Sequence, residues 1–249
     1  MPTSRYSRET SSLEAVKQAM LLTDATRTIL VCLAGVGVLV GAARAEEQAG
    51  VRLFHEVDIA VSFPTGAVAA LSYTPTLSLL DRRLNMGLGA RFSSYFDGGG
   101  IAYPNGDADL LAADANNTLT VTTPRNYAVN LMFAASLRLY RGLEAGLNID
   151  LLGVGFGPEA TGTYAGTDPR FAGPQQASPT RFNLLLFGTH DRGQLDSEFF
   201  LAYWLGDWGV RAGVSHMSTE YTTSRKLDAG NDRFRASATR FFLAGGHRF

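Results

Sequence analysis

Cysteine is almost absent from this chain, whose 249 residues contain only Cys32. A single thiol excludes a disulfide framework and a zinc site built from cysteines. Charged residues are also scarce, at 18% of the chain, and the net charge of −1 leaves no basic surface of the kind that nucleic-acid-binding proteins carry. Hydrophobic residues nevertheless reach 45%, so the chain has enough apolar surface to fold rather than remain disordered.

Long hydrophobic runs are missing as well. The apolar stretch 29–41 has only 13 residues, whereas a membrane-spanning helix needs about 20. Arg27 precedes this stretch, and residues 43–45 (Ala-Arg-Ala) follow it with small residues at positions −3 and −1 of a cleavage site. These parts make up a secretory signal peptide, although a buried core helix is an alternative. We therefore expect a leader over residues 1–45, with Met20 as an alternative start, and an exported domain over 46–249.

After the leader, apolar and polar residues alternate with a period of two. This is the pattern of β-strands with two unlike faces, and no comparable helical periodicity follows residue 46. The sequence therefore predicts an all-β domain. Its expected strands cover residues 51–63, 67–80, 84–96, 127–140, 143–155, 194–205, 208–218 and 236–249.

Alternation alone does not say which face of the sheet is inside. A soluble sandwich or barrel buries the apolar face, whereas a membrane barrel turns it to lipid. The polar face here consists mainly of Gly, Ala, Ser and Arg, and Lys226 is the only lysine after the leader, which does not fit a water-exposed surface. Aromatic residues gather near the strand ends, as at membrane interfaces: Phe63, Tyr95, Phe96, Tyr127, Tyr140, Tyr203, Trp208 and Phe249.

A sheet in lipid has to close, because an open edge would leave unpaired backbone groups in the membrane. The prediction is therefore a closed antiparallel transmembrane β-barrel, with eight strands or, as an alternative, ten. Segment 181–187 does not fit eight strands. It is an extracellular hairpin, a lumen plug, or one of two extra strands, whose partner would lie near 158–167.

Residues 50–249 resemble the small outer-membrane β-barrels of Gram-negative bacteria, of the OmpA, OmpX and OmpW kind. The resemblance rests on the leader, the alternation, the short turns and long loops, and a last strand that ends in Phe249. It implies outer-membrane lipid as the surroundings and the barrel-assembly machinery as a partner, with Phe241, Leu243 and Phe249 as the assembly signal. Gly245 and His247 depart from the pattern, because the family carries hydrophobic or aromatic residues there.

Both termini of such a barrel are expected in the periplasm. Tight turns then face the periplasm, at 81–83, 141–142 and 205–207. Long connections face outward as solvated loops, at 97–126, 156–193 and 219–235.

The inward face carries six residues of each charge sign. Unpaired charges are costly inside a narrow lumen, and an ion-selective pore shows rings of one sign instead. We therefore expect a salt-bridged, closed lumen rather than a pore. The residues of this predicted lumen charge network are Arg52, Glu56, Asp58, Arg91, Arg138, Glu144, Asp150, Asp196, Glu198, Arg211, Arg240 and Arg248.

Catalytic groupings are few. His216, Ser218 and Glu220 share one face, expected to meet lipid, but side chains two residues apart on a strand are separated by about 7 Å, too far for a Ser–His–acid site. His55 points to the opposite face from the two acidic residues that follow it closely in the sequence. We therefore expect no enzyme and no catalytic residue.

Cofactor and metal motifs are equally weak. The stretch Asn105–Asp109 lacks the length and ligand order of an EF-hand, His190 and Asp191 are interpreted as turn residues, and no glycine-rich phosphate loop precedes a helix. We therefore expect no metal and no cofactor.

Three functions remain open. The first is a structural or surface-interaction barrel that meets an extracellular ligand or partner through its loops. The second is a narrow transporter for small or apolar solutes, whose upper pocket would be lined by Leu152, Val154, Leu185 and Phe187. The third is a lipid-modifying enzyme.

Overall fold

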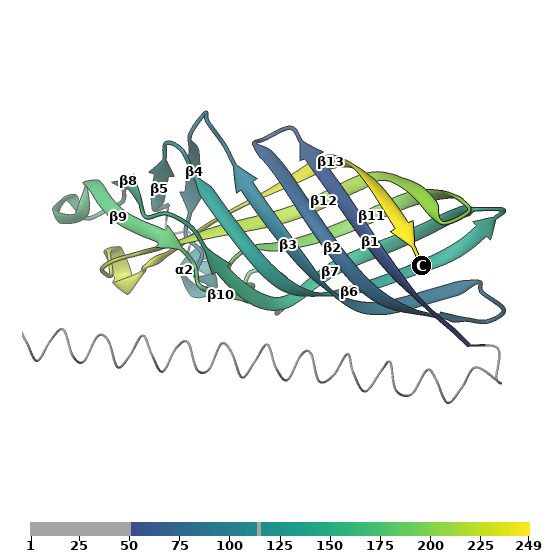
Figure 1. The fold of residues 1–249 in the computed structure, drawn as a ribbon. Helices are drawn as coiled ribbons and strands as arrows, with labels where there is room; N and C mark the ends of the chain where they lie inside the picture. Colours follow the sequence, from purple (N-terminus) through teal and green to yellow (C-terminus); the bar gives the residue numbers. More distant parts are fainter. Residues whose placement is uncertain (1–50, 114–115) are drawn as a thin grey trace, which may run out of the picture. The chain divides into compact units, whose positions relative to one another are not determined.

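The computed structural model describes residues 51–113 and 116–249, so the predicted leader lies outside the described residues. Eight long antiparallel strands form a closed ring (Figure 1) in the order β1–β2–β3–β6–β7–β11–β12–β13, and β13 returns to pair with β1. Their bounds are β1 Arg52–Phe63, β2 Ala67–Leu79, β3 Leu84–Phe96, β6 Arg125–Tyr140, β7 Leu143–Phe156, β11 Leu195–Leu205, β12 Trp208–Thr223 and β13 Arg233–Arg248.

The prediction of an all-β, eight-stranded closed barrel is confirmed, and the ten-stranded alternative is wrong. Most predicted strand ends agree within two residues, but β12 and β13 run further. They continue pairing beyond residue 218 up to Thr222 and Arg233, because residues 219–223 carry hydroxyl and aromatic side chains that favour extended backbone.

The two ends of the barrel differ. One end, here called the turn end, carries the tight turns at 80–83, 141–142 and 206–207. Gly142 shows why these turns are short: its φ is +75°, and an added Cβ would lie 2.5 Å from the Trp204 carbonyl oxygen, so only glycine fits. The opposite end, here called the loop end, carries the long connections.

The sequence predicted that the long connections at the loop end are solvated loops. This prediction is wrong, because they contain short strands. Five short strands lie in them, and four of these pair with one another: β4 Ile101–Pro104, β5 Thr118–Val121, β8 Ala160–Ala165 and β9 Gly173–Pro179. β9 pairs with the end of β12, β8 with β9, β5 with β8 and β4 with β5. A bridge from Asn105 to Phe234 of β13 completes a second, smaller ring. We call these four strands and the outer ends of β12 and β13 the cap.

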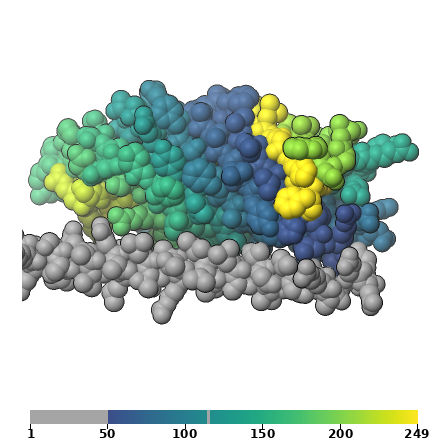
Figure 2. All heavy atoms as spheres, viewed as in Figure 1, coloured from purple at the N-terminus to yellow at the C-terminus, as the bar shows by residue number. Residues whose placement is uncertain are grey.

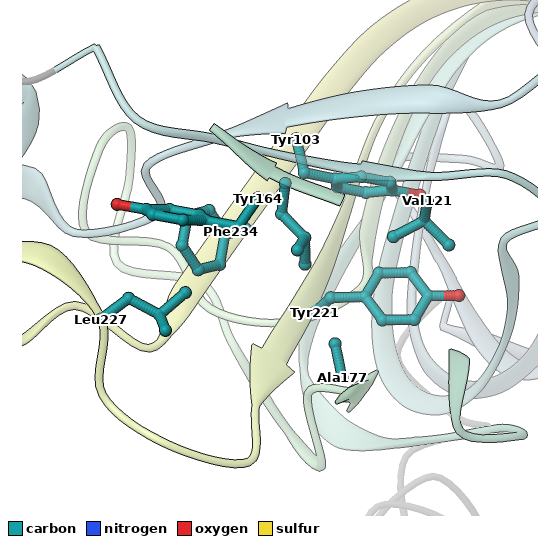
Figure 3. Close-up of a cluster of buried hydrophobic side chains, with 8 residues drawn as sticks. Tyr103, Val121, Tyr164, Ala177, Tyr221, Leu227 and Phe234 are labelled. Atoms are coloured by element: carbon teal, nitrogen blue, oxygen red, sulfur yellow. The ribbon is translucent and has the colours of Figure 1, made fainter. Parts of the chain in front are cut away.

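The cap has its own hydrophobic core, which Figure 3 shows in close-up. Tyr103 meets Tyr221 edge to face at 5.2 Å between ring centroids, and Tyr164 meets Phe234 in the same way at 5.8 Å. The buried members of this core are Tyr103, Leu119, Val121, Tyr164, Ala177, Tyr221, Leu227 and Phe234.

Short helices complete the cap. They are α2 Ala108–Ala112, η1 Pro169–Phe171 and η2 Asp228–Gly230. The side chain of Asp107 accepts the backbone N–H groups of Asp109 and Leu110, so it serves as the N-cap of α2. No helix in residues 51–113 or 116–249 is long and apolar enough to cross a membrane.

Segment 181–187 forms β10 (Phe182–Leu184), which pairs with β7 at the loop end. Leu184 also bridges Arg192, so the segment is one side of a hairpin. It supplies no ninth or tenth barrel strand, because the proposed partner β8 pairs with β5 and β9 instead. The segment is therefore a hairpin at the loop end rather than a barrel strand, and its buried Asn183 reaches the lumen residue Asn130.

Candidate functional site

The outer wall of the barrel is apolar. On β1, Ile59 is 62% exposed and Phe63 is 50% exposed, and Val214 and Leu243 repeat this pattern on the strands across the closure. Figure 2 shows this wall at the place where β13 lies against β1. The predicted end-of-strand aromatics are exposed on this wall, except for two. Tyr127 is half-buried, stacked between Phe92 and Phe156.

The second exception is Tyr95, which the sequence analysis had placed on the wall. It is 1% exposed and lies inside, because it shares the strand face of Arg91 and Ser93, and the guanidinium of Arg240 lies 5.2 Å from its ring centroid.

The inside of the barrel is polar and charged. Arg91, Asp150 and Glu198 are buried to 1–2% exposure, as are Asn130 and Asn148. A soluble barrel has the opposite arrangement, since it buries its aliphatic side chains and exposes its charges. A closed sheet with an apolar exterior and a polar interior satisfies its backbone hydrogen bonds and fits lipid. This is the architecture of a small outer-membrane β-barrel.

The dimensions agree with that assignment. The shortest barrel strand, β11, has 11 residues. At about 3.3 Å per residue and a tilt of about 40°, such a strand climbs ~28 Å, which matches an apolar band of about 25 Å. The chain therefore resides in the bacterial outer membrane, as the sequence predicted.

Comparison with known proteins adds little beyond this. No family model matches the chain, and the search of curated proteins finds no match. Among solved structures, the chain is similar to Neisserial surface protein A at 8% identity and a TM-score of 0.38, over 81% of this chain and 98% of that one. It is also similar to the attachment invasion locus protein Ail of Yersinia pestis, at 12% identity and a TM-score of 0.32, over 80% of this chain and 97% of that one. A third similar structure is the outer-membrane enzyme PagL, at 13% identity and a TM-score of 0.33, over 76% of this chain and 97% of that one.

The middle of the lumen is organised around Arg91 of β3. Its Nη2 donates to Glu198 at 2.7 Å, and its Nη1 lies 3.5 Å from Asp150 and 3.8 Å from Asp196. Asn148 also donates to Glu198, at 2.7 Å. One guanidinium thus faces three carboxylates contributed by β7 and β11, which lie two and three strands around the barrel from β3.

Arg211 of β12 forms a second cluster toward the turn end. It is ion-paired with Asp58, lies 3.8 Å from Glu56, and stacks over the Phe200 ring at 4.8 Å. The cation–π contact and the two carboxylates together hold this guanidinium in place.

Arg248 of β13 forms the third cluster, next to the turn end. It donates two hydrogen bonds to Glu144, at 2.9 and 2.8 Å, and one to Glu56 at 2.9 Å. Its guanidinium also lies 3.6 Å over the Trp204 ring. Sequence reasoning missed Trp204, although its inward position on β11 follows from the alternation.

Three arginines of the predicted network are placed differently. Arg52 is exposed at the turn end and has no ion pair among the described residues. Arg240 donates to the carbonyl oxygens of Thr65 and Ala238 rather than to a carboxylate. Arg138 is exposed, and its guanidinium lies 3.9 Å from Glu144. The deep lumen therefore holds more carboxylates than guanidinium groups, and the expected equal balance inside it is wrong.

Little space is left in the lumen. The cavity between the Arg211 and Arg248 clusters has a volume of about 20 Å³. A single water molecule needs about 10–15 Å³ of such space. At the loop end, Asn183 donates to Asn130 at 2.8 Å and Gln194 donates to Ser93 at 2.8 Å, so amide side chains cover the lumen there.

The three candidate catalytic residues on β12 do not converge. His216 is exposed and shares a hydrogen bond with Thr239, whereas Ser218 is buried and donates to the Gly193 carbonyl at 3.5 Å. Glu220 was expected to face lipid, but it is 1% exposed, because the chain from Thr180 to Gly193 covers it.

Glu220 instead serves the cap as the partner of Arg233, whose Nε and Nη2 donate to it at 2.8 and 3.0 Å. Burial acts to lower the pKa of Arg233, but the hydrogen bond and the charge of Glu220 outweigh it, so this pKa lies above its ordinary value.

The residues suggested for the upper pocket of a transporter are not arranged as predicted. Leu151 is an extra residue on β7, since Leu131 faces Leu152 and Met132 faces Asp150. A β-bulge of this kind exchanges the two faces of the strand beyond it, so Val154 points outward at 36% exposure. Phe187 is 80% exposed, and no described cavity is lined by these residues.

Proposed function

We propose that this protein is a closed, non-conducting barrel that holds a preorganised cap at the cell surface for contact with an extracellular ligand or partner. The observation that carries the proposal is the combination of a filled lumen with a cap that has its own core. The proposal places the loop end outside the cell and both ends of the exported domain, residues 46–249, in the periplasm. This is the orientation of the family that the sequence resembles.

The filled lumen argues against transport. The lumen cavity of about 20 Å³ has room for about one water molecule, and charges of both signs line it. Widening the path would require separating Arg91 and Arg211 from their carboxylates, which is costly in a narrow space.

The cap argues for recognition. A surface that is ordered before binding loses less conformational entropy when it meets a partner. The edge-to-face tyrosine and phenylalanine pairs and the Glu220–Arg233 ion pair provide this order.

A cavity of about 300 Å³ lies beside the cap, between the start of β6 and the edge of β8. Three threonines line it (Thr122, Thr123 and Thr161), together with Arg125 and Glu159. Hydroxyl groups and one charge of each sign suit a hydroxyl-rich ligand such as an oligosaccharide, because both charged groups form strong hydrogen bonds to hydroxyls. We place the extracellular contact at this cavity.

Planar-bilayer recording tests the closed lumen. The refolded protein is reconstituted, and its insertion is verified by the gel mobility that changes on heating. We expect no discrete openings; stable, reproducible openings would refute the non-conducting barrel.

A glycan array tests the contact site. The double variant R125Q/E159Q is expected to lose binding that the unaltered protein shows. R170Q is the matched control, since Arg170 lies in the cap, pairs with Asp168 and does not line the cavity. Absence of any bound glycan, or equal binding by R125Q/E159Q, contradicts a hydroxyl-rich ligand at this cavity.

A further inference from the structure

The turn end contains a second cavity, with a volume of about 320 Å³. Five arginines line it, and only two acidic side chains, those of Glu144 and Asp207, accompany them. The arginines are Arg52, Arg82, Arg138, Arg141 and Arg248. This excess of positive charge is the reverse of the deep lumen, where carboxylates outnumber guanidinium groups.

Most of this positive charge is not neutralised. Arg248 is committed to Glu144 and Glu56, and Arg138 reaches Glu144 only at 3.9 Å. Within the described chain, Arg52, Arg82 and Arg141 have no ion pair with any carboxylate. Several guanidinium groups therefore surround one space with donors left free.

Arg248 and Trp204 form the floor of this cavity. Both also line the small lumen cavity of about 20 Å³, and the guanidinium stacks on the indole at 3.6 Å. The turn-end cavity is therefore separated from the lumen by a held side-chain pair. It is a pocket at the end of the barrel rather than the mouth of a pore.

We propose that this cavity binds phosphate groups of a multiply charged anion. The planar guanidinium fork matches phosphate oxygens, and several such forks around one volume favour an anion that carries more than one negative charge. The cavity exceeds the ~10–15 Å³ that one water molecule needs more than twentyfold, which leaves room for more than one phosphate group. The ligand is either a soluble polyphosphate or the headgroups of anionic phospholipids in the adjacent leaflet.

Tryptophan fluorescence offers a direct reporter. The described chain has two tryptophans: Trp204 lines the cavity, whereas Trp208 is 69% exposed on the outer wall. In a W208F background in detergent micelles, titration with inorganic tripolyphosphate at low salt should change the Trp204 emission saturably. Isothermal calorimetry on the same samples should give the same dissociation constant.

The variants alter residues in two of the tight turns, at 80–83 and 141–142. R82Q/R141Q removes two lining charges and is expected to weaken tripolyphosphate binding about tenfold or more, because hydrogen bonds to charged groups are the strong ones. R83Q is the matched control, since Arg83 is the exposed neighbour of Arg82 in the same turn and does not line the cavity. Each variant must keep the circular dichroism and gel mobility of the folded barrel.

The outcomes separate as follows. Saturable binding that R82Q/R141Q weakens and R83Q leaves unchanged supports the site. Equal weakening by R83Q shows general charge attraction and overturns it, as does the absence of saturation in both measurements. Nanodiscs identify the source: competition by phosphatidylglycerol, but not by phosphatidylcholine, indicates a headgroup ligand, and no competition by either indicates a soluble polyphosphate.

Discussion

Replacing Arg91 by methionine tests how the lumen is held together. Methionine keeps most of the side-chain volume but leaves Asp150, Asp196 and Glu198 facing one another at the centre of the barrel without their guanidinium. Removing one partner of a buried ion pair costs about 3–5 kcal/mol, which corresponds to a factor of about 10² to 10³·⁵ in the unfolding equilibrium. Three carboxylates around one cation place R91M at the upper end of this range.

The assay is urea unfolding of the barrel in lipid vesicles, followed by tryptophan emission and gel mobility. R52M is the control, because Arg52 is exposed and has no ion pair among the described residues, so its loss should change stability by less than about 0.5 kcal/mol. Adding E198Q to R91M removes one of the unpaired charges and should restore part of the lost stability. A loss below about 1 kcal/mol for R91M, or no recovery with E198Q, refutes the reasoning.

Three further predictions concern the cap and the last strand. F234A removes a fully buried ring from the cap core and should make residues 97–124 sensitive to limited proteolysis, while the barrel stays resistant. Burial, and then the neighbouring Asp228, raise the pKa of Tyr164 to about 12, and burial raises that of Tyr221 to about 12. Because these folded-state values exceed the unfolded ones, the cap loses stability as pH rises from about 10 through 12, visible as late tyrosinate absorbance at 295 nm. Deletion of Phe249 should reduce assembly into the membrane in cells but not refolding in detergent; normal assembly contradicts the predicted signal.

The barrel strands were predictable because lipid and lumen impose opposite demands on the two faces of each strand. That contrast produces a period of two over eleven or more residues, as on β3, where Arg91 and Ser93 point inward and Phe92 outward.

The cap was not predictable in the same way. Its strands have four to seven residues, and apolar side chains alternate over only two or three positions, as at Tyr103 and at Leu119 with Val121. Such short patterns resemble loops, and their pairing depends on contacts far apart in the sequence, such as Asn105 with Phe234.

Individual side chains were misplaced for identifiable reasons. A single bulge at Leu151 exchanged the faces of β7, which alternation cannot reveal. Glu220 is covered by a segment that joins it only in the folded chain. The deep lumen has an excess of carboxylates because Arg52 and Arg138 lie toward the turn end, where they are exposed. Their position along the barrel axis depends on the strand register rather than on residue type.

The central claim is that the apolar face meets lipid and the polar face is enclosed. Spin labels at two neighbouring positions of β2 test it most directly, in a protein whose only cysteine, Cys32, is replaced by serine. A label at L71C should be reached by oxygen dissolved in the bilayer, because Leu71 is 49% exposed on the wall. A label at A70C should be reached by neither oxygen nor a water-soluble nickel complex, because Ala70 is buried inside. Equal oxygen access at both positions, or nickel access at L71C, would contradict the account.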